Sequence, residues 1–194
     1  MLPLENMNLT GQFLIAMPAM QDPYFAKTVT FICTHNQDGA MGVVINRPLE
    51  FNVDYLFQQI NIDCDYPKIK DKPVYFGGPV QHERGFVLHA PGTEYNSTIA
   101  INEAVSLTTS KDILESTAAN EGPSKIMIAL GYAGWTAGQL EQEVSNNAWL
   151  SVKTTNVKQL NDLIFDLPYS EKLEMAMALL GVDFATLSDV AGHA

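Results

Sequence analysis

The stretch that most constrains the fold is an apolar pentapeptide, Ile126 to Leu130, which runs directly into a glycine-rich segment, Gly131 to Trp135. The five apolar residues do not alternate with polar ones, and such a run is typical of a strand that is covered on both faces. Gly131 and Gly134 can adopt positive φ or let another backbone approach closely. We therefore expect a central strand of the sheet to end here in a tight turn.

A helix is predicted after this turn. Thr136 and Gln139 have the spacing of a capping box, and Asn146 and Asn147 are expected to end the helix because Asn tolerates the left-handed conformation. A glycine turn before a helix N-terminus can bind an anion. The segment lacks the Lys-Ser/Thr pair of a P-loop and the G-x-G-x-x-G pattern. The alternative, which the spacing favours, is a packed corner whose two aromatic residues fill the core.

Length and charge limit the classes of protein to which the chain can belong. With 194 residues it is long enough for a substantial core, and we expect a single domain over 1–194 with a loose N-terminal arm at 1–8. There are 22 acidic and 11 basic residues, for a net charge of −11, and no basic run. Direct nucleic-acid binding is not expected, because duplex binding draws most of its affinity from clustered Lys and Arg.

Cysteine usage and the N-terminal sequence predict a cytoplasmic protein. Cys33 and Cys64 are the only cysteines, and they form no CxxC motif, so we interpret them as reduced thiols. Glu5 and the absence of basic residues ahead of the apolar residues 13–17 do not fit a signal peptide. No apolar run approaches the length of a membrane span, and we expect no membrane association.

Short strand patterns alternate irregularly with short helical patterns along the chain. Strands are predicted at 13–17, 28–34, 41–46, 74–76, 85–89, 98–101, 105–107, 126–130 and 149–153. Helices are predicted at 52–60, 109–120, 136–146, 157–165 and 170–181, with a further turn of helix in the last dozen residues. Because strict β-α-β alternation is absent, the predicted fold class is α+β: a mixed, mostly antiparallel sheet that curls towards a barrel, with helices packed outside.

The sequence contains no recognisable catalytic or metal-binding pattern. No G-x-S-x-G motif occurs, and the histidines are dispersed: His35, His82, His89 and His193. We therefore predict no metal site and no cofactor. Glu141 and Glu143 lie two residues apart on the predicted helix, so they do not face each other as an acid–base pair would.

Two arginines follow predicted strands and are candidates for ligand binding. Arg84 lies in a polar turn that begins at Gln81, and it could hold a carboxylate or phosphate through two hydrogen bonds. The alternative, slightly favoured, is an internal ion pair of Arg84 with Glu83 or another acid. Arg47 follows Asn46 at the end of a predicted hairpin.

We predict that these turns gather in one recess. The predicted ligand-binding residues are Asn46, Arg47, Arg84, Gly131, Tyr132, Gly134, Trp135, Gln139 and Glu141. The first hypothesis is a cytosolic regulatory module that binds a small ligand or a protein partner. The second is an enzyme in which Arg84 binds an anionic substrate and His82 or Glu141 moves a proton.

Taken together, several segments resemble the AlgH/YqgE family of bacterial proteins. The matching segments are 9–11, 13–18, 20–25, 42–48, 77–80, 84–89, 130–135 and 138–141. The resemblance implies one α+β domain with a sheet folded towards a barrel, and it supplies no catalytic residues. Members are often labelled transcriptional regulators, which gives a third hypothesis. The absence of a helix-turn-helix pattern and the acidic charge oppose direct DNA contact.

Overall fold

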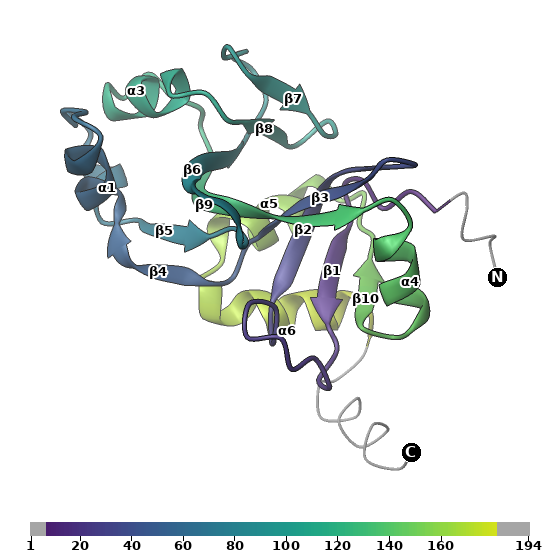
Figure 1. The fold of residues 1–194 in the computed structure, drawn as a ribbon. Coiled ribbons are helices and arrows are strands. Elements are labelled where there is room, and N and C mark those ends of the chain that lie inside the picture. Colours follow the sequence, from purple (N-terminus) through teal and green to yellow (C-terminus); the bar gives the residue numbers. More distant parts are fainter. Residues whose placement is uncertain (1–6, 182–194) are drawn as a thin grey trace.

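The computed structural model describes residues 7–181 (Figure 1). The predicted terminal turn of helix lies outside the described residues, as do residues 1–6 of the predicted N-terminal arm. No helix within residues 7–181 combines the length and the apolar character that a membrane span requires.

The described residues contain ten strands, which form one curled sheet. They are β1 (Phe13–Ala16), β2 (Val29–Asn36), β3 (Gly39–Val44), β4 (Pro48–Asn52), β5 (Pro73–Phe76), β6 (Val80–His89), β7 (Thr98–Ala100), β8 (Ser106–Thr108), β9 (Ile126–Thr136) and β10 (Trp149–Val152). The main order is β10-β1-β2-β3-β9-β6-β8-β7, while β5 pairs with both β4 and β9. Within residues 7–181, only the β5–β9 pairing is parallel. The predicted α+β class and mostly antiparallel sheet are confirmed.

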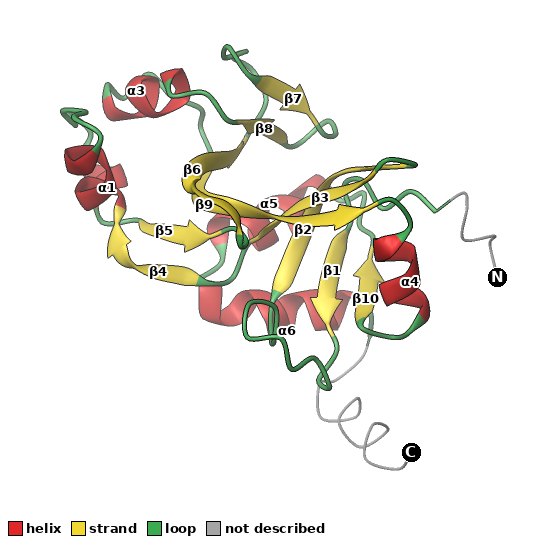
Figure 2. Ribbon diagram, in the orientation of Figure 1, coloured by secondary structure: helices red, strands yellow, loops and turns green. Residues whose placement is uncertain are grey.

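Helices surround this sheet (Figure 2). They are α1 (Val53–Gln59), α2 (Pro67–Lys70), α3 (Asp112–Ala118), α4 (Gln139–Ser145), α5 (Val157–Asn161), the π-helix η2 (Asp162–Asp166) and α6 (Tyr169–Leu179). α6 lies alongside β1 and β2, and α1 and α3 lie at the opposite end of the molecule (Figure 1). The predicted helix at 157–165 is therefore α-helical only in its first half.

Three apolar clusters fill the spaces between sheet and helices. The first joins the sheet to α5, η2 and α6 through Phe13, Ile15, Phe31, Met127, Ala129, Ile164 and Met177. The second joins it to α1, α2 and α3 through Val53, Phe57, Ile69, Val87, Ile113, Ile126 and Ile128. The third lies under α4 and includes Leu14, Ile32, Trp135, Leu140 and Trp149. Alternate residues of β9 from 126 to 129 thus enter different clusters, which confirms a strand covered on both faces.

β9 does not end at Leu130, so the predicted turn from Gly131 to Trp135 is wrong. The strand continues to Thr136, and its partners change along its length. Its first half pairs with β6 and, in parallel, with β5, whereas its second half pairs with β3, with Gly134 opposite Met41. Gly131 has φ of +76°, so it bends the strand without removing it from the sheet. The glycine-rich segment is therefore the place where β9 changes its partner strand, and the chain does not turn there.

At this change of partner two glycine segments touch backbone to backbone. A Cβ added to Gly131 would lie 2.2 Å from the carbonyl oxygen of Gly78, and one added to Gly77 would lie 2.2 Å from that of Gly131. The N–H of Gly77 donates to the carbonyl of Leu130, and its own carbonyl accepts from Val44, both at 2.8 Å. Side chains here would force β5, β3 and β9 apart, so the chain crosses through residues that have none.

Candidate functional site

Arg47 and Asn46 hold backbone rather than facing a recess. The guanidinium of Arg47 donates to three backbone carbonyl oxygens at 2.8, 2.5 and 2.8 Å, those of Pro23, Tyr24 and Ala26. The side chain of Asn46 accepts from the N–H of Val29 at 2.9 Å and donates to the carbonyl of Lys27 at 3.0 Å. These bonds fasten the loop before β2 to the end of β3, and they use most of the donors that a ligand would need.

Arg84 lies on an exposed bulge of β6, next to the crossing glycines. Its Nη2 donates to Oγ1 of Thr109 at 3.2 Å, and its Nη1 donates to Oε1 of Gln81 at 3.4 Å. Among the described residues no carboxylate lies within ion-pair distance of Arg84, so the alternative pair with Glu83 is not formed. Its role as an anion-binding residue stays a prediction.

Glu141, at the start of α4, is bonded to a buried histidine. Its Oε1 lies 2.9 Å from Nε2 of His35, whose Nδ1 accepts the N–H of Leu9 at 3.0 Å. Because Nδ1 is an acceptor, Nε2 carries the hydrogen and donates it to the carboxylate. The pair fastens α4 to β2. His82 lies on the β6 bulge instead. His82 and Glu141 therefore do not line a common pocket among the main hollows, and their predicted acid–base role stays a prediction.

Glu143 accepts hydrogen bonds from both tryptophans of the chain. Its Oε2 accepts from Nε1 of Trp135 and of Trp149, each at 2.9 Å, and its Oε1 accepts from Nε2 of Gln139 at 2.9 Å. Oε1 of Gln139 also accepts the N–H of Thr136 at 3.0 Å, which is half of the predicted capping box. The N-cap itself is Gly138, at φ +76°, rather than Thr136. These contacts dock α4 onto β9 and β10.

The predicted site residues are therefore only partly brought together. Tyr132, Gly134 and Trp135 line a shallow groove of about 550 Å³ along β3 and β9. This groove and the three other main hollows on the described residues are not lined by the remaining predicted site residues: Asn46, Arg47, Arg84, Gly131, Gln139 and Glu141. Asn46 and Arg47 bond to backbone groups and Glu141 bonds to His35, so these polar side chains already have partners within the protein. A recess shared by all nine residues stays a prediction.

A more enclosed cleft of about 390 Å³ lies between β5, the first half of β9 and η2. We call it the β5–η2 cleft. Its walls are largely aliphatic and include Val53, Ile69, Ile126, Met127, Ile128, Ile164 and Leu167. Its polar groups are few and come from different elements: Lys72, Tyr75, Asp166 and Tyr169. An apolar concavity with a few convergent polar groups is the usual form of a small-molecule site.

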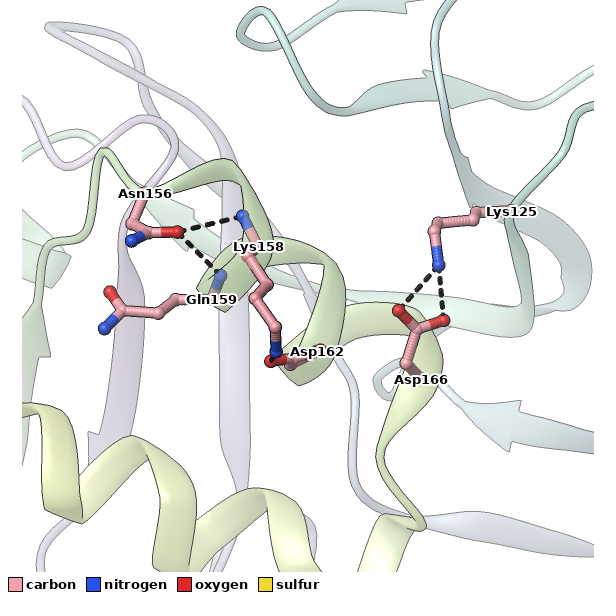
Figure 3. Close-up of polar contacts among 6 residues, drawn as sticks. All are labelled: Lys125, Asn156, Lys158, Gln159, Asp162 and Asp166. Atoms are coloured by element: carbon pink, nitrogen blue, oxygen red, sulfur yellow. Dashed lines mark hydrogen bonds and ion pairs between the residues drawn. The ribbon is translucent and has the colours of Figure 1, made fainter.

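The π-helix η2 forms one wall of this cleft. The N–H of Leu167 donates to the carbonyl of Asp162 at 2.9 Å, which closes the wide turn. Ion pairs hold both ends, Lys125 with Asp166 and Lys158 with Asp162, each at 2.6 Å (Figure 3). π-Helical turns are rare and frequently lie at functional sites. Here the turn presents its last residue, Asp166, to the rim of the cleft.

A buried lysine lies directly behind the cleft wall. Lys172 of α6 is 1% exposed, and its Nζ donates to the carbonyls of Ile45 and Ile164 at 3.0 and 2.9 Å. Nζ also lies 4.8 Å from the centre of the Tyr75 ring. Burial lowers the pKa of Lys172 to about 7, although the negative charge of Asp166 acts in the opposite direction. Perturbed groups of this kind cluster at functional sites.

Lys172 was not among the residues predicted from the sequence, although a signal was present. Lys172 lies four residues before Ala176, which is fully buried, so the helical period places it on the inward face of α6. The apolar period predicts the helix but does not by itself single out a lysine that lies on the buried face. Tyr75 was assigned only to a strand, and burial raises the pKa of its phenol.

Comparison with known proteins identifies the family. The AlgH-like family pattern matches residues 13–185. The chain belongs to the AlgH-like family. It is 54% identical over 191 residues to a UPF0301 protein of Thiobacillus denitrificans, covering 98% of this chain and 100% of that one. It is 49% identical over 191 residues to a UPF0301 protein of Dechloromonas aromatica, with the same coverage. The resemblance predicted from sequence segments is confirmed.

Two solved structures share the AlgH-like fold of this chain. The solution structure of the AlgH protein from Pseudomonas aeruginosa matches with a TM-score of 0.77 and 46% identity, covering 100% of both chains. A crystal structure of a protein from Corynebacterium diphtheriae matches with a TM-score of 0.65 and 19% identity, covering 87% of this chain and 85% of that one. The second match shows the fold alone.

Proposed function

We propose that this AlgH-like protein is a regulatory binding module for a small ligand, and that the ligand occupies the β5–η2 cleft. The observation that carries the proposal is the meeting, in one cleft, of an aliphatic wall, a π-helix and a few polar groups from separate elements. The polar groups would orient the ligand, and the aliphatic wall would supply most of the affinity.

The position of the cleft supports a regulatory role. One wall belongs to the part of the molecule formed by β5 and α2, and the other belongs to η2 and the start of α6. A ligand in the cleft would contact both parts and would favour whichever arrangement of them fits it best. Lys172 links the same two parts, since Nζ binds the carbonyl of Ile164 in η2 and lies over the ring of Tyr75 in β5.

The proposal is tested by NMR with 1-octanol as a neutral probe. Methyl signals of Met127, Ile128 and Ile164 should shift and saturate during the titration. The Leu167→Trp variant, which fills the cleft, should abolish these shifts. Ile99→Trp is the matched control, because Ile99 is 48% exposed on β7 and does not line the cleft. Native mass spectrometry of the purified protein would add the identity of any retained molecule.

Two outcomes would overturn the proposal. In the first, the cleft methyl groups do not respond, or they respond equally in Leu167→Trp. In the second, only Met41, in the shallow groove along β3 and β9, responds to the probe. That result would move the binding site to the groove that contains Tyr132 and Trp135.

A further inference from the structure

A second hollow adjoins the β5–η2 cleft. It has a volume of about 290 Å³ and lies between α2 and the loop that follows α3. We call it the α2–α3 hollow. It shares three lining residues with the cleft, namely Ile69, Lys72 and Ile126. The two concavities are therefore neighbours, and one extended molecule could occupy both.

The linings of the two concavities differ in chemistry. The cleft is mainly aliphatic, whereas the α2–α3 hollow exposes Lys68, Lys72, Asn120 and Ser124. Within residues 7–181 none of these four side chains makes a hydrogen bond or an ion pair with another protein group. Their donors are thus available to a ligand.

In contrast, other lysines near the hollow do form ion pairs. Lys70, on the same helix as Lys68, lies 3.6 Å from a carboxylate oxygen of Asp54. Lys125, next to Ser124, lies 2.6 Å from Asp166. The unpaired ammonium groups of Lys68 and Lys72 therefore form a local positive site on a protein whose net charge is −11. Such a site attracts anions.

We propose that the ligand is an amphiphilic anion, with its aliphatic part in the β5–η2 cleft and a carboxylate or phosphate head on Lys68 and Lys72 in the α2–α3 hollow. This proposal rests on the proposed function and adds the chemical class of the ligand. Lys72 lines both concavities, so it sits where the aliphatic part meets the head. Asn120 and Ser124 supply further donors to the oxygens of the head.

A series of eight-carbon probes tests the head group on the intact protein. Dissociation constants are measured for octanoate, octyl phosphate, 1-octanol and octylammonium. We expect at least one anion to bind about tenfold more tightly than 1-octanol, and octylammonium to bind most weakly, because two unpaired ammonium groups attract an oxyanion and repel a cation. The two anions show which oxyanion the site prefers.

Variants locate the head. The double variant Lys68→Gln, Lys72→Gln should abolish the preference for anions, measured as the ratio of the octanoate or octyl phosphate affinity to the 1-octanol affinity of the same variant. Lys111→Gln is the control, since Lys111 is exposed and pairs only with Glu115. Equal affinity of 1-octanol and both anions would overturn the amphiphilic-anion proposal and leave ligand binding in the cleft intact. An anion preference that survives the double variant would also overturn it. Failure of 1-octanol to bind would instead overturn the proposed function.

Discussion

At the scale of single residues, Gly131 determines where β9 changes partners. Its φ of +76° and the close carbonyl of Gly78 impose two separate requirements on this position. Gly138 has the same φ of +76°, but nothing lies within 4 Å of the position that a Cβ would occupy there. An alanine at position 138 would therefore meet only the unfavourable backbone conformation. An alanine at position 131 would meet both that conformation and the steric clash.

We predict that Gly131→Ala destabilises the protein far more than Gly138→Ala. Gly138→Ala should lower the free energy of unfolding only through the left-handed conformation, by about 1 kcal/mol. Gly131→Ala also places a methyl group against a backbone oxygen, and we expect a total of at least about 3 kcal/mol. Urea unfolding measures both free energies. Equal losses would mean that the contact between Gly131 and Gly78 does not limit this position.

At the scale of elements, α6 is held to the sheet and to η2 by a lysine rather than by apolar side chains alone. Lys172 supplies donors to carbonyls just after β3 and within η2, and the whole residue is buried. The arrangement satisfies two backbone oxygens in the interior. It also places an ionisable group where its charged form is costly.

The pH dependence of stability should reveal this group. The unfolded chain keeps the ordinary pKa of 10.5 for Lys172, whereas in the folded protein the pKa is about 7. Between these values the unfolded state binds the proton and the folded state does not. Lys172 therefore adds stability as pH rises above 7, by at most about 1.4 kcal/mol per pH unit, and its contribution is constant below 7.

We predict that the difference in unfolding free energy between the natural protein and Lys172→Met grows in favour of the natural protein from pH 7 to pH 9. Urea unfolding at several pH values measures this difference. Lys111→Met, at an exposed surface position, should show a constant difference over the same range. Parallel curves for Lys172→Met would show that the folded protein does not lower the pKa of this lysine.

At the scale of the whole molecule, charge distribution limits the partners. The net charge is −11, and the unpaired lysines of the α2–α3 hollow cover a small area beside an apolar cleft. A surface of this kind suits a small anion. A duplex would require basic residues along a broad face to release its counterions.

We predict no complex between this protein and duplex DNA at micromolar protein and low ionic strength. Fluorescence anisotropy of a labelled duplex measures this, with a basic DNA-binding protein as the positive control. A complex that weakens steeply as salt is added would contradict the prediction and would support the third hypothesis, that of a DNA-binding regulator.

Local sequence predicted most elements because burial leaves a periodic pattern. The apolar run 126–130 is a strand covered on both faces, and Asn147 adopts φ +58° directly after α4, as an asparagine at a helix end can. The continuation of β9 past Gly131 was not predictable, since a glycine that bends a strand and one that ends it have the same local sequence. Only the contact with Gly77 and Gly78 distinguishes them.

The sequence by itself determined the α+β class, the family and the acidic net charge, because these depend on composition, short-range pattern and shared segments. The tertiary structure decided which polar residues remain available to a ligand. Arg47 and Glu141 find partners far along the chain, whereas Lys68 and Lys72 find none within the described residues. Hydrogen-bond partners distant in sequence leave no local pattern, so only the folded chain shows which donors are already used.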